Sequence, residues 1–133
     1  MRIRALLVLA CIAALAGSAH GGIAQTSLKI TVIPNAGKPK VGRRSYTLRC
    51  GPAGGTLPHA ATACSKLAKT EKPFAPVPKG MACTQIYGGP QKALVAGVYR
   101  GKRVGATFTR TDGCQIARWN RVQFLFPIAT GIR

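Results

Sequence analysis

The sequence predicts an α+β fold: a five-stranded antiparallel sheet with one main helix and a short second helix packed on it, and two disulfides. Five short segments place apolar residues at alternate positions, as strands do, whereas one longer segment shows helical spacing. Four cysteines remain after a predicted export signal. The connections are short and rich in Gly and Pro, which favours antiparallel pairing of neighbouring strands.

Residues 1–24 are predicted to be a secretory signal peptide. Two arginines near the start are followed by an apolar stretch at residues 5–16 and a small, polar stretch up to residue 24. The apolar stretch is too short to span a bilayer. A buried N-terminal helix is the alternative. Residues 25–133 then form a single mature domain, which we expect to be secreted and extracellular, without a transmembrane segment.

The strand segments are bounded by turn residues or proline. The third and fourth flank the turn Arg100-Gly101-Lys102, which predicts a β-hairpin with glycine at a position that accepts a positive φ. Pro127 would stop the last strand. The five predicted strands cover residues 28–33, 46–50, 94–99, 104–109 and 122–126.

The main helix is predicted over residues 59–69. Thr56 is a candidate N-cap, and Pro58 lies early enough that its missing N–H costs nothing. Apolar side chains recur on one face, at Ala60, Ala63, Cys64 and Leu67. A further helical turn is expected over residues 115–120.

Removal of the signal removes Cys11 and leaves an even number of cysteines in a small exported chain. This count predicts two disulfides, and three pairings are open at this point. A zinc site is disfavoured because no Cys-x-x-Cys pair is present and His59 is the sole histidine of the mature chain. We therefore expect no metal and no cofactor.

The chain is strongly basic, with 20 Lys and Arg against Glu71 and Asp112. Such a surface attracts polyanions at long range. Two acids, one mature histidine and no free cysteine are a poor basis for catalysis, so we expect that the protein is not an enzyme. Few aromatic residues are interleaved with the cations, which disfavours specific recognition of nucleic acid.

The run Cys83-Thr84-Gln85-Ile86-Tyr87 lies between a Pro-rich stretch and a predicted strand. A cysteine tethers the backbone two residues before the long side chain of Gln85. This arrangement is typical of a stiff, substrate-like segment that is offered to a protease. The Gly88-Gly89-Pro90 run that follows leaves the stiffness of the downstream side open.

Several segments, in this order, resemble the Streptomyces subtilisin inhibitor family, and the likeness covers about residues 28 to 126. They are Tyr46-Thr-Leu-Arg-Cys50, Gly55-Thr-Leu-Pro58 followed by Ala63-Cys64, Met81-Ala-Cys83-Thr-Gln-Ile-Tyr87, Gly97-Val-Tyr99, Gly101-Lys-Arg-Val104, Phe108, Cys114 and the aromatic segment 122–126.

The resemblance implies a fold and a partner. It implies the bridges Cys50–Cys64 and Cys83–Cys114, the five-stranded sheet with helices, and a homodimer joined through sheet faces. It also implies that the partner is an extracellular serine protease.

The resemblance also implies the site. The reactive bond would be Gln85–Ile86, with Gln85 in the primary specificity pocket of the protease. Loop contacts would come from Met81, Ala82, Cys83 and Thr84 upstream of that bond and from Tyr87 downstream. Because Gln85 carries no charge for an acidic pocket, we expect subtilisin-like enzymes to be inhibited better than trypsin-like ones. The alternative is a secreted binding protein for polyanions or anionic surfaces on the same scaffold, with inhibitory activity lost.

Overall fold

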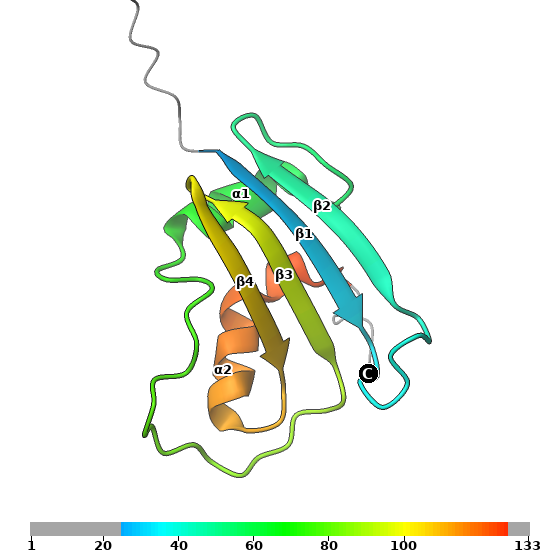
Figure 1. Cartoon of the computed structure of the whole chain (residues 1–133), viewed down its shortest axis with the longest axis vertical. Helices are drawn as coiled ribbons and strands as arrows, with labels where there is room; N and C mark the ends of the chain where they lie inside the picture. Colours follow the sequence, from blue (N-terminus) through cyan, green and yellow to red (C-terminus); the bar gives the residue numbers. More distant parts are fainter. Residues whose placement is uncertain (1–24, 128–133) are drawn as a thin grey trace, which may run out of the picture.

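The computed structural model describes residues 25–127, and its framework is a four-stranded antiparallel sheet in the order β2-β1-β3-β4 (Figure 1). The predicted signal peptide lies outside the described residues. The elements are β1 (Thr26–Ile33), β2 (Arg44–Cys50), α1 (Ala60–Lys69), β3 (Lys92–Tyr99), β4 (Lys102–Thr109), α2 (Gly113–Val122) and the 3₁₀ turn η1 (Gln123–Leu125).

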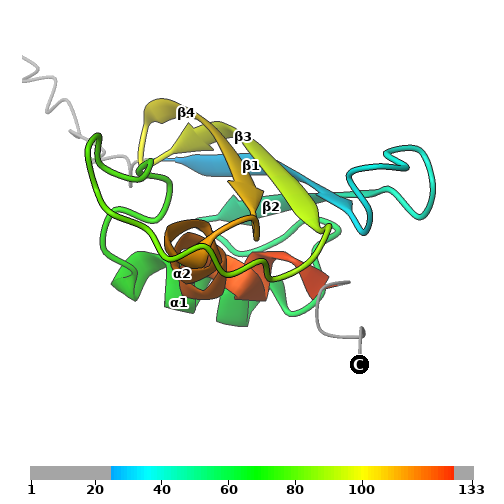
Figure 2. The ribbon, with the colours of Figure 1, turned by 90° about the horizontal axis from the view of Figure 1, so that it is seen from below.

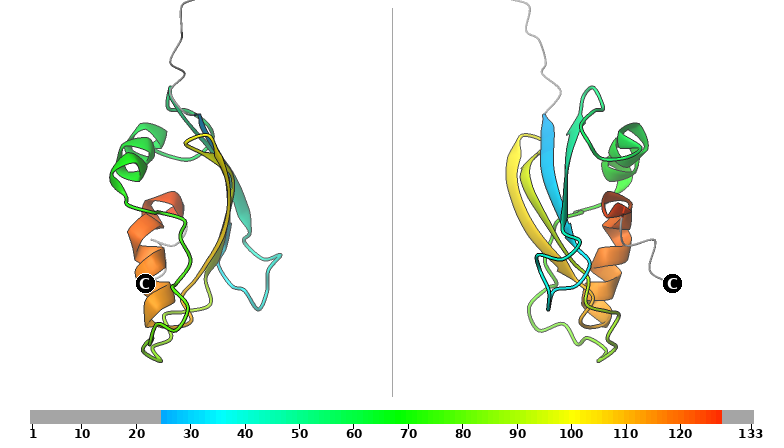
Figure 3. Two further views of the ribbon diagram at one scale, coloured as in Figure 1. Left: turned by 60° about the vertical axis from the view of Figure 1, so that its left-hand side comes forward. Right: turned by 90° about the vertical axis from the view of Figure 1, so that its right-hand side faces the viewer.

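The sheet and the helices form two layers. Figures 2 and 3 show α1 and α2 against one face of the sheet, while its other face carries no helix. Leu28, Ile30 and Val32 of β1 point into the space between the layers and are almost fully buried. The core is completed by Leu48, Leu57, Ala63, Leu67, Ala93, Val95, Phe108, Trp119, Val122, Leu125 and Phe126.

The predicted β3–β4 hairpin is present. Arg100 and Gly101 form its two-residue turn with φ of 48° and 77°, so that Tyr99 pairs with Lys102. The turn also holds the C-terminal end of α1. The Tyr99 hydroxyl donates to the Leu67 carbonyl at 3.2 Å, and Arg100 Nη2 donates to the Ala68 carbonyl at 2.9 Å. The Leu67 carbonyl also accepts from the N–H of Thr70 at 3.2 Å, whereas the Arg100 bond satisfies a carbonyl that the helix end leaves without a backbone partner.

The main helix has the predicted buried face, with Ala63 and Leu67 in the core, but its N-terminus differs from the prediction. The helix begins at Ala60 after His59, and no side chain caps it. Thr56 bonds to β2 instead, because its Oγ1 accepts from the Thr47 N–H at 2.9 Å. Cys64 lies on the sheet-facing side and forms the Cys50–Cys64 bridge, which joins the helix to the end of β2.

The prediction of a fifth strand at residues 122–126 is wrong, since the sheet has four strands in the described residues. That segment continues α2 into η1, and α2 is longer than the helical turn predicted over residues 115–120. Trp119, Val122, Leu125 and Phe126 are buried, and their spacing of three, three and one places them on one side of a helix. The apolar residues of this short segment fit both periods. Val122, Phe124 and Phe126 alternate as in a strand, whereas Val122, Leu125 and Phe126 share one side of a helix, and packing against the sheet favours the helix.

We predict that Phe126→Ala lowers the free energy of unfolding by about 3–5 kcal/mol, as loss of a buried aromatic ring does. The Phe126 ring packs against the rings of Phe108 and Trp119, with centroids 5.4 Å and 4.6 Å away. Urea unfolding measures the change. The matched control is Phe124→Ala, because Phe124 is half-buried and should lose about 1–2 kcal/mol. Equal losses would contradict this packing.

Candidate functional site

The segment of residues 81–87 is an irregular loop at one end of the molecule (Figure 1). It follows the Pro-rich connector that leaves α1 and runs beside α2 toward that end (Figures 1 and 2). Met81, Ile86 and Tyr87 are 54%, 60% and 65% exposed, which is unusual for large apolar side chains. Thr84 and Gln85 are exposed as well. The residues that the sequence singled out are therefore together on the surface.

The upstream part of the loop is attached to the start of α2 by one covalent bond and one hydrogen bond. The disulfide Cys83–Cys114 joins Cα atoms 5.4 Å apart. The N–H of Gly113 donates to the carbonyl of Thr84 at 2.9 Å. The backbone is thus held at the two residues that directly precede Gln85.

Glycine is required at position 113 because the loop passes very close to it. A Cβ on Gly113 would collide with Thr84 Oγ1. Asp112 fixes this point as the start of α2, since its side chain accepts from the N–H of Gln115 at 2.9 Å. The Asp112-Gly113 pair is both a helix cap and a support for the loop.

The downstream part of the loop is attached to the end of β4. The N–H of Gly88 donates to the carbonyl of Arg110 at 2.7 Å. Gly88 also packs against α2, because a Cβ there would lie 2.9 Å from Ile116 Cδ1. The glycine run therefore provides a close approach of the loop backbone to its support.

The connector that leads to the loop is held by Arg118 of α2. Its Nε donates to the carbonyl of Ala75 at 2.9 Å, and its Nη1 donates to the carbonyl of Thr107 at 3.1 Å. The guanidinium lies over the Phe108 ring, 4.7 Å from the centroid. Burial, and to a lesser extent the charge of Arg121, lowers the pKa of Arg118. One side chain thus joins the connector, the helix and the sheet.

The site offers a held and exposed peptide rather than reactive side chains. Gln85 and Ile86 lie between Thr84 and Gly88, whose backbone bonds go to Gly113 and Arg110. Among the described residues, Cys83, Asp112 and Cys114 lie close enough together to suggest a metal site. Both sulfurs are joined in the disulfide, however, and thiolates are needed to bind a metal.

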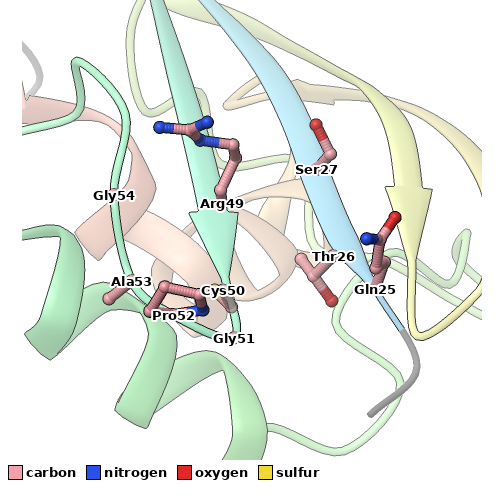
Figure 4. Close-up of a pocket in the computed structure, with 9 residues that line it drawn as sticks. All are labelled: Gln25, Thr26, Ser27, Arg49, Cys50, Gly51, Pro52, Ala53 and Gly54. Carbon is pink, nitrogen blue, oxygen red and sulfur yellow. The ribbon is translucent and has the colours of Figure 1, made fainter. Parts of the chain in front are cut away.

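A hollow of about 360 Å³ lies at the opposite end of the molecule from the loop, beside the start of β1 and the end of β2 (Figure 4). Its lining contains no carboxylate and no histidine, and Cys50 is disulfide-bonded. Arg49 is the one charged side chain in this lining. General acid–base chemistry has no candidate residue there.

Comparisons with known proteins give consistent results. The sequence profile described as "Subtilisin inhibitor-like" matches residues 24–111. Subtilisin inhibitor-like protein 1 of Streptomyces cacaoi is 28% identical over 108 residues, which cover 77% of this chain and 97% of that protein. The subtilisin inhibitor of Streptomyces violaceus is 39% identical over 75 residues, which cover 53% of this chain and 51% of that protein.

Among solved structures, sermetstatin of Streptomyces caespitosus, crystallised in complex with Bacillus licheniformis subtilisin, matches with a TM-score of 0.48. It is 27% identical in sequence, and the match covers 74% of this chain and 96% of that chain.

Fold and site define a small, disulfide-bonded α+β protein that presents an exposed loop. The profile match covers more than half of the chain, and the chain therefore belongs to the subtilisin inhibitor-like family. It is accordingly a protease inhibitor and not an enzyme. Neither helix within residues 25–127 has the length and apolarity that crossing a membrane requires.

The structure contains both bridges that the resemblance implied, Cys50–Cys64 and Cys83–Cys114. The sequence reasoning missed the supports of the loop, which are the Arg110 carbonyl, Gly113, Ile116 and Arg118. Backbone carbonyls give no sequence signal. The available signal was the Asp112-Gly113 pair beside Cys114. This pair marks the start of α2, shortly after the end of β4.

We predict that Gly113→Ala displaces the upstream part of the loop, because the new Cβ meets Thr84 Oγ1. The amide of residue 113 should then exchange with solvent faster, since its bond to Thr84 is lost. Adding Thr84→Ala should restore protection by removing the hydroxyl. Gly105→Ala is the control, as a Cβ there meets nothing within 4 Å. Unchanged exchange in Gly113→Ala would contradict the contact.

Proposed function

We propose that this protein is an exported inhibitor of subtilisin-like serine proteases that binds in a substrate-like manner, with Gln85–Ile86 as the reactive bond. One observation carries the proposal: the exposed residues Gln85 and Ile86 lie between two backbone anchors, at Thr84 and Gly88. Their hydrogen-bond partners, Gly113 and Arg110, lie at the start of α2 and just after the end of β4.

Binding would use the loop backbone and one specificity side chain. Residues 81–84 would pair with an exposed strand edge of the protease, as extended peptides do. The side chain of Gln85 would enter the primary pocket. Ile86 and Tyr87, which are already exposed, would bury apolar surface on the leaving-group side. A loop held in one shape loses less entropy on binding than a free peptide does.

The chemistry would belong to the protease. Its serine attacks the Gln85 carbonyl, the bond to the Ile86 nitrogen breaks, and the protease histidine passes the proton to the new amine. The reverse reaction re-forms the peptide bond and returns the proton to histidine. Because Cys83 and Cys114 lie on opposite sides of the cut, their bridge would keep the two pieces joined. A tethered amine remains at a high effective concentration.

Export would follow from the predicted signal at residues 1–24. We also propose a homodimer through the face of the sheet that is free of helices. Leu94, Ala96 and Val98 alternate along β3 with inward-facing residues and so lie on that face. Lys29 pairs with Ala96 and lies on the same face, so two copies would oppose like charges and should associate more tightly as salt rises.

The basic surface supports the second candidate function, binding of polyanions. Against 20 Lys and Arg, the chain has Glu71 and Asp112 as its acidic side chains. Such binding would weaken steeply with salt, whereas inhibition through the apolar and backbone contacts of the loop should survive moderate salt. If inhibition weakened with salt as steeply as polyanion binding does, the polyanion function would be favoured.

We predict that the mature protein titrates subtilisin to a stoichiometric end point. Gln85→Pro should abolish this inhibition, because proline removes the backbone N–H and fixes φ at the reactive residue. The measurement is residual protease activity against added inhibitor, with circular dichroism as a check that the variant folds. Lack of inhibition by the parent would sink the proposal.

We predict that Gln85→Lys shifts inhibition toward trypsin. The ammonium would pair with the acidic group of a trypsin-like pocket, which the neutral Gln85 cannot do. Trypsin should therefore become the more tightly inhibited enzyme, and the ratio of the two inhibition constants should change by at least about tenfold. Lys79, which is exposed upstream of the loop, provides a control in the variant Lys79→Gln. Trypsin inhibition by the parent that equals or exceeds subtilisin inhibition would refute the assignment of Gln85.

A further inference from the structure

The segment that leads from the loop into β3 rests on the side chains of Arg110 and Gln91. Gln91 is 7% exposed, although it is polar and adjoins a surface loop. Arg110 Nη1 donates to Gln91 Oε1 at 3.3 Å. A Cβ on Gly89 would collide with Gln91 Oε1, and one on Gly88 would lie 3.2 Å from Arg110 Cβ. The two side chains therefore lie directly against the glycines.

Arg110 contacts this segment in two separate ways. Its carbonyl accepts from the N–H of Gly88, and its guanidinium holds the amide oxygen of Gln91. Its Nε is buried and has no hydrogen-bond partner within residues 25–127. An unpaired buried N–H is unfavourable, and apolar side chains fill such places at lower cost. A contribution to the stability of the fold at the end of β4 therefore does not explain why residue 110 is an arginine.

We propose that Arg110 and Gln91 are a positioning pair for the leaving-group side of the reactive loop. This inference rests on the proposed function. The disulfide and the Gly113 bond hold only the residues before Gln85. The Ile86 amine, once formed, is positioned by the chain that follows it, and that chain is bonded to Arg110 at Gly88 and lies against the Gln91 side chain at Gly89. If this segment were loose, the Ile86 amine could move away from the ester that the protease serine forms with Gln85. Water would then hydrolyse that ester and complete the cleavage.

The test compares Arg110→Met with Arg43→Met, which removes the same charge from an exposed position just before β2. Each variant is mixed with subtilisin, and two rates are measured: association, and appearance of chain cut at the Gln85–Ile86 bond. Arg110→Met should associate within about twofold of the parent but be cut about tenfold faster. Arg43→Met should match the parent in its rate of cleavage.

Variants at Gln91 separate positioning from a general loss of stability. Gln91→Leu removes the acceptor and should also be cut faster, whereas Gln91→Glu keeps an acceptor for Arg110 and should behave as the parent. The double variant Arg110→Met with Gln91→Leu should be cut no faster than the quicker single variant, because the two act as a unit. Thermal unfolding of each variant identifies any that do not fold.

The inference is overturned if folded Arg110→Met and Gln91→Leu are both cut at the parent's rate, or if their effects multiply in the double variant. If the parent itself does not inhibit subtilisin, the proposed function fails, and the role of the pair fails with it. The parent measurement is made first, so the two failures are distinguishable.

Discussion

The stretch of residues 110–114, which runs from the end of β4 into the first turn of α2, holds both sides of the exposed loop, and the geometry of the site depends on this double attachment. Its first carbonyl accepts from Gly88, its glycine donates to Thr84, and its last residue is bonded to Cys83. Because both attachments start from one segment of five residues, the distance between the ends of the loop is set locally.

The rest of the fold keeps that stretch in place. Phe108 anchors the end of β4 in the core, and Trp119 anchors α2 beneath the same sheet. Arg118 joins the helix to the β4 backbone at Thr107 and to the connector at Ala75. Side chains on regular elements are more precisely placed than those on loops, so an irregular surface segment gains its order from its supports.

The sequence predicted much of this arrangement, because period and spacing are local properties. Alternation located the strands of the sheet, and the Gly101 turn located the hairpin. The alternation pattern failed at residues 122–126, where a segment of five residues fits both helical and strand periods. The prediction that Thr56 caps the helix was also wrong, since its hydroxyl oxygen accepts from the N–H of Thr47 in β2. Supports such as the Arg110 carbonyl emerge only from tertiary contacts, which no local pattern contains.

The most direct test of the account is resealing of the cut protein. Chain cleaved at the Gln85–Ile86 bond, with Cys83–Cys114 intact, is incubated with active subtilisin, and the intact fraction is followed by mass spectrometry. We expect intact chain to reappear, and we expect none from the Cys83→Ala, Cys114→Ala double variant. Steady degradation of the cleaved parent, with no intact chain, would contradict the claim that the supports hold the two ends together.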